Sequence, residues 1–337
     1  MIRLSILDQS PIPNGKSAIE ALKDTTRLAI EAERLGYTRF WVSEHHFSPS
    51  LAGSSPEVLI SHLASKTQSI RVGSGGVMLP HYSAYKVAEN FKVLEALNPN
   101  RIDLGLGRAP GGMPLATQAL QEGYFTTGDP YPQQIDDLKT YLYNLTGDAF
   151  RFPGLLATPI IETVPKMWLL GSSGGSARIA AQQGTGYAFA HFINGNGGED
   201  IMRWYQERFQ PSVINDNPQS MVAIFAFVAD SEEKAEDLAR TLDISLLLLE
   251  NGKATDRYPS TDEAKRYPLT DYDYHRIAEN RKRMIVGTPE QVKTKILEMS
   301  HDYRTEEFMI VTITHNFEDK LHSYRLLAEA FNLNGDQ

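Results

Sequence analysis

The stretch Val72-Gly73-Ser74-Gly75-Gly76-Val77-Met78-Leu79-Pro80 decides how the rest of the chain is interpreted. Its apolar residues predict a buried strand, yet glycines crowd into it, and each weakens a strand through backbone entropy and the lack of a packed side chain. A bulge, an unusual peptide geometry or a flat ligand lying on the backbone would explain them. A tight strand end in an ordinary core explains them equally well, and this stretch alone leaves both interpretations open.

Strands and helices alternate on both sides of this stretch. Besides the glycine-rich stretch, the predicted strands cover residues 2–7, 39–43, 101–107, 166–170, 187–190, 222–229 and 307–312. The predicted helices cover residues 17–35, 56–67, 84–97, 133–145 and 177–183. This alternation predicts an α/β protein with a parallel sheet, and about eight such units in 337 residues predict a closed (β/α)8 TIM barrel with insertions after its strands.

We expect residues 1–337 to form a single domain, with one long insertion at about 251–284. The insertion is polar, rich in tyrosine and charge, and interrupted by Pro259 and Pro268. Long connections in compact domains are usually functional lids or disordered segments. We therefore expect a mobile lid that becomes ordered when ligand binds.

The composition excludes several classes of function. With 33 basic and 42 acidic residues the net charge is -9, which argues against nucleic acid or an anionic membrane as partner. The chain has no cysteine, which excludes disulfides, iron–sulfur clusters and cysteine nucleophiles. Its first residues predict a strand and not a signal peptide, and no stretch is apolar enough to span a bilayer. We expect a cytoplasmic protein.

Residues able to do chemistry follow the predicted strands at their C-terminal ends, where the active sites of such barrels lie. They are Glu44, His45, His46, Gly75, Gly76, Arg108, Ser172, Ser173 and Ser176. The glycine and serine run at 171–176 precedes a helix and offers backbone N–H groups, hydroxyls and the positive end of a helix dipole, which together suit a phosphate. A serine-capped helix is the structural alternative. Arg108 favours phosphate, because it supplies a charge that serines lack.

The pair His45 and His46 raises the question of a metal ion, since histidine is a common metal ligand. Adjacent residues on a strand point to opposite faces, so the two would not easily bind one ion. We predict no metal site, and favour a histidine that binds ligand or moves protons. Two histidines that are merely hydrogen-bonded at a strand end are the structural alternative. A Gly-x-Ser-x-Gly motif is absent, which disfavours a serine hydrolase.

At this point the sequence resembles the bacterial luciferase-like flavin monooxygenases. The matching segments occur in the family's order, at 41–47, 72–80, 89–97, 101–108, 172–184 and 286–292. The first contains Glu44-His45-His46, and the last contains a glycine-threonine-proline-glutamate sequence that opens a late helix. No single segment is specific, but their order and spacing are, and together they cover nearly the whole barrel.

The resemblance implies a luciferase-like barrel that binds FMN as reduced flavin, supplied by a separate NAD(P)H:flavin reductase. The flavin would react with oxygen to give a flavin hydroperoxide that oxygenates a small organic substrate. It also implies a cis peptide between Gly75 and Gly76 beneath the isoalloxazine ring. His45 matches the family's histidine near the reactive flavin edge, and His46 and Glu44 would support it.

The phosphate of FMN would then lie on Arg108, Ser172, Ser173 and Ser176. Where luciferase has a glutamate at the first position of this loop, the present chain has Ser172, so that contact must differ. The helices at 56–67 and 84–97 would form much of the family's usual homodimer interface. Residues 110–127 and 191–198 follow two strands and would shape the substrate pocket.

Three alternatives stay open. A deazaflavin-dependent hydride-transfer oxidoreductase on the same barrel shares the cis peptide and the phosphate site, and differs in the reduced cofactor and in oxygen use. A non-catalytic protein that sequesters FMN is the second, and the presence of Glu44, His45 and His46 speaks against it. A long-chain aldehyde luciferase is the third, which the glycines and the lack of a visible paired subunit disfavour.

Overall fold

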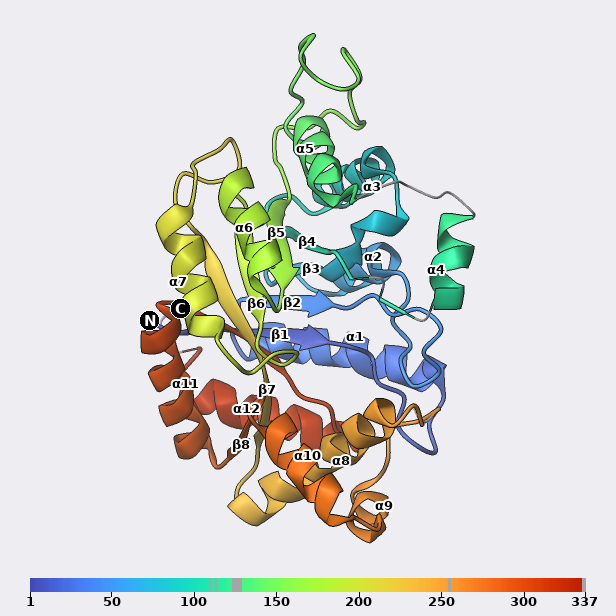
Figure 1. Ribbon diagram of the computed structural model, residues 1–337, viewed down its shortest axis with the longest axis vertical. Coiled ribbons are helices and arrows are strands. Elements are labelled where there is room, and N and C mark those ends of the chain that lie inside the picture. The colour runs from blue at the N-terminus through green and yellow to red at the C-terminus, as the bar shows by residue number, and fades with distance from the viewer. Residues whose placement is uncertain (110, 113, 123–128, 254–255, 335–337) are drawn as a thin grey trace.

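Eight parallel strands close into a barrel with helices around it, as predicted (Figure 1). This computed structural model describes residues 1–109, 111–112, 114–122, 129–253 and 256–334. The strands follow one another around the barrel from β1 to β6, and β7 and β9 complete the circle between β6 and β1. They are β1 (Arg3–Asp8), β2 (Arg39–Val42), β3 (Arg71–Met78), β4 (Ile102–Gly107), β5 (Lys166–Gly171), β6 (Gly186–Ala190), β7 (Ser220–Val228) and β9 (Glu307–Val311).

A further short strand, β8 (Met284–Gly287), extends one part of the wall. Phe225 of β7 pairs with β9 on one side and with Met284 of β8 on the other. The last β6 pair with β7 is Ala190 with Ala223, so β8 takes over the same side of β7 where β6 ends. This strand was not predicted from the sequence, because only four residues separate the polar insertion from the next helix.

The helices lie outside the strands. They are α1 (Ala18–Arg34), α2 (Pro56–Lys66), α3 (Ala84–Leu97), α4 (Pro114–Gln121), α5 (Tyr131–Leu142), α6 (Gly174–Gln183), α7 (Gly198–Arg208), α8 (Glu232–Glu250), α9 (Thr261–Arg266), α10 (Asp271–Arg281), α11 (Pro289–Tyr303) and α12 (Phe317–Ala330), with a 3-10 turn η1 (Leu79–His81). Ser17 and Glu20 form the predicted capping box at the start of α1. Within the described part of the chain, no helix is long and apolar enough to cross a membrane.

The insertion after α8 is folded onto that helix, and Figure 1 shows α8, α9 and α10 gathered below the barrel strands. Arg281 of α10 pairs with Asp243 of α8 at 2.7 Å, and Lys265 of α9 pairs with Asp237 at 2.6 Å. A small apolar cluster around Leu247 and Ala264 lies between these helices. Residues 254–255 of the expected lid lie outside the described residues, and its mobility stays a prediction.

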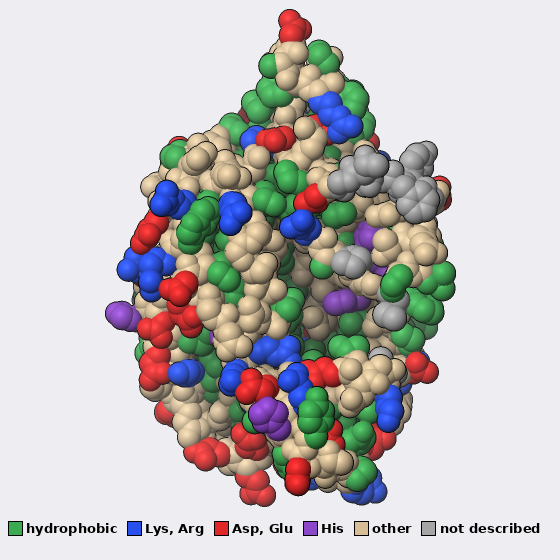
Figure 2. Space-filling view, viewed as in Figure 1, with side chains coloured by type: hydrophobic (Ala, Val, Ile, Leu, Met, Phe, Trp, Pro, Cys, Tyr) green, Lys and Arg blue, Asp and Glu red, His purple; other side chains and the backbone are tan. Residues whose placement is uncertain are grey.

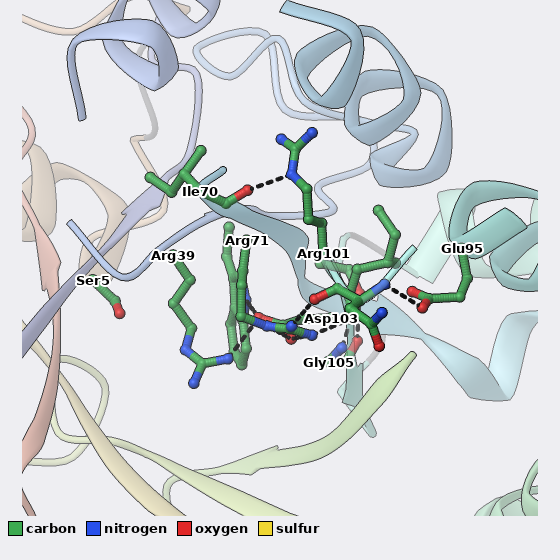
Figure 3. A network of polar contacts seen from close by, with 12 residues as sticks. Ser5, Arg39, Ile70, Arg71, Glu95, Arg101, Asp103 and Gly105 are labelled. Carbon is green, nitrogen blue, oxygen red and sulfur yellow. Dashed lines mark hydrogen bonds and ion pairs between the residues drawn. The ribbon is translucent and has the colours of Figure 1, made fainter. Parts of the chain in front are cut away.

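Charged side chains fill the N-terminal end of the barrel (Figure 3). Arg39 is buried between Asp103, at 2.7 Å, and Glu307, and Arg71 also pairs with Asp103 at 2.7 Å. Burial alone would raise the pKa of Asp103, but the two arginines outweigh it and hold this pKa below its ordinary value. We call these four side chains the basal charge network. Above it lie the indoles of Trp41 and Trp168, whose ring centroids are 5.9 Å apart.

Candidate active site

A cavity of about 420 Å³ opens at the C-terminal ends of the barrel strands. Figure 2 shows the molecule hollowed on this face, with histidine side chains in the wall of the hollow. All the predicted site residues except His46 line the cavity: Glu44, His45, Gly75, Gly76, Arg108, Ser172, Ser173 and Ser176. The barrel thus brings together residues that are far apart in the sequence, as expected of strand ends.

Glycines form part of the cavity floor because no side chain fits there. The peptide bond between Gly75 and Gly76 is cis, as the resemblance implied. The register of β3 against β4 shifts between Gly75 and Val77, so Gly76 is the extra residue of a bulge. A Cβ on Gly76 would lie 2.7 Å from the carbonyl oxygen of Gly105, and one on Gly75 would lie 2.7 Å from Leu7 Cδ1. The crowding of glycine is thereby explained by close packing at a bulge that faces a cavity.

Trp41 supports this floor from below. Its indole N–H donates a hydrogen bond to Asp103 at 2.9 Å, which ties the ring to the basal charge network. A Cβ on Gly75 would lie 3.2 Å from the Trp41 ring, so the indole lies directly against the glycine backbone. The floor therefore has one fixed position, set by a buried carboxylate.

The serine run forms one end of the cavity. Helix α6 begins at Gly174, not at residue 177 as predicted, because the two glycines join its first turn. Ser173 is the N-cap residue and its hydroxyl makes no capping hydrogen bond, while Ser176 is buried in the first turn. The first N–H groups of a helix have no partner within it. This end of the cavity thus presents backbone donors and hydroxyls to an anion.

Arg108 lies beside this helix terminus. A Cβ on Gly175 would lie 3.7 Å from Arg108 Nη1, which places the guanidinium over the first turn of α6. Arg108 Nη2 pairs with Asp129 at 2.6 Å. A cation, hydroxyls and a helix N-terminus together have the donors that a phosphate needs.

His45 lines the cavity and has a buried nitrogen without a partner in the described part of the chain. Its Nε2 is buried and has no hydrogen-bond partner among the described residues, and the same is true of Ser43 Oγ, which also lines the cavity. Burial, with a smaller contribution from the nearby charge of His46, lowers the pKa of His45 to about 4. The imidazole is therefore neutral at neutral pH. Buried polar atoms without partners are rare, and here both belong to residues that line the cavity.

His46 faces a different environment from His45, although both residues lie beyond the end of β2 at Val42. Its Nε2 lies 2.7 Å from Glu44 Oε1, which also accepts a hydrogen bond from the Tyr82 hydroxyl at 2.7 Å. Glu44 Oε2 accepts from the backbone N–H of Met78 at 3.0 Å. Burial and the bond to Glu44 raise the pKa of Tyr82. Glu44 therefore fastens the end of β2 to the end of β3, directly beside the cavity.

Some site residues were not predicted from the sequence. Asp129 and Tyr82 belong to no recognisable motif, and only the fold brings them to Arg108 and Glu44. Of the loops expected to shape the substrate pocket, Gly111, Phe192 and Ile193 line the cavity. Residues 110, 113 and 123–127 of those loops lie outside the described residues. The described residues contain no group of three His, Asp or Glu side chains arranged to hold a metal ion.

Comparison with known proteins places this site in a family context. The family model described as luciferase-like monooxygenase matches residues 2–306. The Bacillus subtilis protein YwcH is 62% identical over 98% of this chain and 99% of its own length. The N-acetyl-S-alkylcysteine monooxygenase of the same organism is 38% identical over 98% of each chain.

Solved structures agree with this match. The crystal structure of apo-MsnO8 superposes with a TM-score of 0.91 at 35% identity and covers 99% of both chains. An F420-dependent secondary alcohol dehydrogenase superposes with a TM-score of 0.70 at 12% identity over 98% of both chains, a similarity that shows the fold alone.

Proposed function

The chain belongs to the luciferase-like monooxygenase family, and from this premise we propose that it is an FMN-dependent monooxygenase acting on a small organic substrate. One observation carries the proposal: a glycine floor, the Arg108 and serine groups of the proposed phosphate site and a neutral histidine line a single cavity at the strand ends. Among the described residues, two that line the cavity, Ser43 and His45, also carry a buried polar atom without a partner, and a small movement on ligand binding could satisfy it.

Arg108, Ser172, Ser173 and Ser176 would hold the phosphate of FMN, and the Gly75–Gly76 backbone would face its ring system. Glycines there leave the backbone bare, so that a flat ring can approach it closely. Reduced FMN, when bound, supplies the two electrons with which oxygen is activated, so that one oxygen atom enters the substrate and the other leaves as water.

His45 would act at the reacting end of the cavity. Its low pKa keeps the imidazole neutral, so that it can donate or accept a hydrogen bond without placing a charge beside the oxygen chemistry. Glu44 positions this segment through its bonds to Tyr82 and Met78, and His46 completes the support.

The proposal includes two partners and a location. A separate NAD(P)H:flavin reductase would supply reduced FMN, as the resemblance implies. A second copy of the chain would cover the face formed by α2 and α3, where a groove of about 730 Å³ contains the exposed apolar side chains of Val58, Val93 and Leu97. We expect the enzyme to work in the cytoplasm.

The phosphate site is tested by titrating FMN into the protein and following fluorescence quenching. We expect Arg108→Ala to weaken FMN binding by roughly 10- to 100-fold, the effect of losing hydrogen bonds to a charged group. Ser176→Ala should weaken it less, because a neutral hydroxyl contributes less. Riboflavin, which lacks the phosphate, is the control ligand, and its affinity should not change. Unchanged FMN affinity in both variants would refute the proposed site.

The reaction is tested with labelled oxygen. The protein, reduced FMN and 18O2 are mixed with candidate substrates that include N-acetyl-S-alkylcysteines, and 18O is sought in the product. We expect His45→Ala to bind FMN like the wild type but to lose oxygen incorporation. Hydride transfer from a reduced deazaflavin, without oxygen consumption, would support the alternative oxidoreductase. FMN binding with no turnover of any candidate would support a sequestering protein.

A further inference from the structure

The cation at the proposed phosphate site is already paired. Arg108 Nη2 lies 2.6 Å from Asp129 Oδ2, and the two side chains are 47% and 39% exposed. Among the described side chains that line the cavity, Arg108 is the one cation. Part of its positive charge is therefore offset by Asp129 at the place where a phosphate carrying up to two negative charges would bind.

Asp129 is held beside Arg108 by the fold as well as by the ion pair. Its Oδ1 accepts a hydrogen bond from the backbone N–H of Tyr131 at 3.2 Å, at the start of α5. Tyr131 is fully buried and its hydroxyl donates to the carbonyl of Leu106 at 3.1 Å, near the end of β4. The carboxylate is thus connected through Tyr131 to the strand end that precedes Arg108, and the ion pair is not its sole contact.

The two sides of the guanidinium face different groups. Nη1 lies over the first turn of α6, close to Gly175, whereas Nη2 is bonded to Asp129. A phosphate at the helix terminus could reach Nη1 while Asp129 stays in place. It would then bind a guanidinium that is shared with a competing anion, and it would be repelled by that anion across a short distance.

We propose that Asp129 is a specificity-determining residue that weakens the binding of phosphate-bearing flavin and so keeps FMN exchangeable. This inference rests on the proposed function, in which the flavin is taken up reduced and released oxidised in each cycle. A phosphate that binds to a partly offset cation is held less tightly, which suits a flavin that is exchanged in each cycle. Asp129 supplies the reduction in charge without blocking the cavity, since it does not itself line it.

The test compares Asp129→Asn with the wild type by fluorescence-quenching titration with FMN and with riboflavin. Asparagine keeps an oxygen that can accept from the Tyr131 N–H and removes only the charge. We expect FMN to bind about fivefold more tightly, the upper range for a half-exposed ion pair, while riboflavin affinity stays constant. The FMN affinity of the variant should also fall more steeply with added salt.

Two controls separate this effect from a general change in charge or fold. Asp129→Glu keeps the charge and should keep the FMN-to-riboflavin affinity ratio near that of the wild type. Asp136→Asn changes the net charge by the same amount on α5, where Asp136 pairs with Lys139, and should leave the ratio unchanged. If Asp129→Asn fails to fold in a thermal melt, Asp129→Ser, which retains a hydroxyl acceptor, replaces it.

The sign of the result decides the inference. Weaker FMN binding by Asp129→Asn would mean that Asp129 orients Arg108 for the phosphate, and would overturn the proposal. An unchanged FMN-to-riboflavin ratio would overturn it as well. Failure of the proposed function would look different: the wild type itself would bind FMN no better than riboflavin, and Arg108→Ala would change nothing, which removes the basis of both proposals.

Discussion

The two ends of the barrel are built from the same strands and differ in how their polar groups are satisfied. At the N-terminal end, the charges of Arg39, Arg71, Asp103 and Glu307 are paired and largely buried. At the C-terminal end, the buried His45 Nε2 and Ser43 Oγ have no partner among the described residues. The hydroxyl of Ser173, the N-cap residue of α6, makes no capping hydrogen bond. Unsatisfied polar groups cost stability. The charge pairs of the N-terminal end stabilise the fold, whereas the two unpartnered atoms named at the C-terminal end belong to residues that line the cavity.

The change from one end to the other follows the inward positions of single strands. On β3 they run from Arg71 to Gly73 and Gly75, and on β4 from Asp103 to Gly105. Alternate residues of a strand face the same side, so each strand carries large side chains at the bottom and none at the top. The cavity is therefore a consequence of residue size along two neighbouring strands.

The largest expected loss of unfolding free energy comes from a substitution in the basal charge network, at the N-terminal end of the barrel. Glu307→Ala leaves the buried Arg39 with one carboxylate partner and removes the acceptor of the Ser5 hydroxyl, which lies at 3.0 Å. Loss of a partner from a buried ion pair costs about 3–5 kcal/mol of unfolding free energy. Urea denaturation measures it, and the FMN affinity of the folded variant should stay near that of the wild type, because Glu307 does not line the cavity.

The matched control for this prediction is a surface ion pair. Lys295 and Glu298 of α11 pair at 3.0 Å with more than half of each side chain exposed. Glu298→Ala should change the unfolding free energy by about 0–1 kcal/mol. If Glu307→Ala costs no more than Glu298→Ala, the basal charge network does not stabilise the fold and the contrast between the two ends is lost.

The next largest loss of unfolding free energy is expected at the glycine floor of the cavity. Gly76→Ala places a Cβ 2.7 Å from a backbone oxygen of β4, so that one strand must shift. Overpacking of this kind costs about 1–3 kcal/mol. We also expect weaker FMN binding, because the floor would move. Denaturation and FMN titration of the same preparation measure both effects.

Gly174→Ala provides the comparison for Gly76→Ala. Gly174 has no atom within 4 Å of its Cβ position, and it begins helix α6. Alanine there should leave stability unchanged or raise it by up to about 1 kcal/mol, because glycine is a poor helix former. Equal unfolding free energies of the two variants would show that β3 and β4 can move apart to accept a side chain at residue 76, and that close packing does not explain the glycines.

Much of this architecture could be predicted from the sequence because its signals are local. Helix α3 has the predicted bounds. The apolar spacing that predicts it lies entirely within the helix, so no distant contact is needed to recognise it. Strand β8 was missed because its four residues are stabilised by pairing with β7, a distant segment that no local pattern reveals. The start of α6 was placed too late because glycine is a poor indicator of helix, although the N-terminus tolerates it.

The site residues also divide into those that could be predicted from the sequence and those that could not. Residues at strand ends, such as His45 and Arg108, were predicted to be neighbours because the barrel topology fixes where strand ends meet. Asp129 could not be predicted, since its position depends on how a long connection returns to the mouth of the barrel. The two histidines have different surroundings, as predicted, but both follow the end of β2 at Val42, so strand alternation does not set their directions. The partners of His46 depend on Tyr82 and on the turn that carries it.

The smallest expected effect is a loss of unfolding free energy at low pH, and it tests His45 at the cavity directly. Burial lowers the folded-state pKa of His45 to about 4, below the ordinary histidine value of about 6.5. The unfolded chain therefore binds this proton first, so the contribution of neutral His45 is complete above about pH 6.5 and is lost as the pH falls towards 4. Between pH 7 and pH 5 the wild type should lose about 1–2 kcal/mol more unfolding free energy than His45→Asn. Urea denaturation at both pH values measures this difference.

His275→Asn, on the exposed surface of α10, is the control and should follow the wild type. Parallel losses in the wild type and His45→Asn would mean that the imidazole is not held neutral by its surroundings, and the neutral histidine would have to be removed from the proposed site.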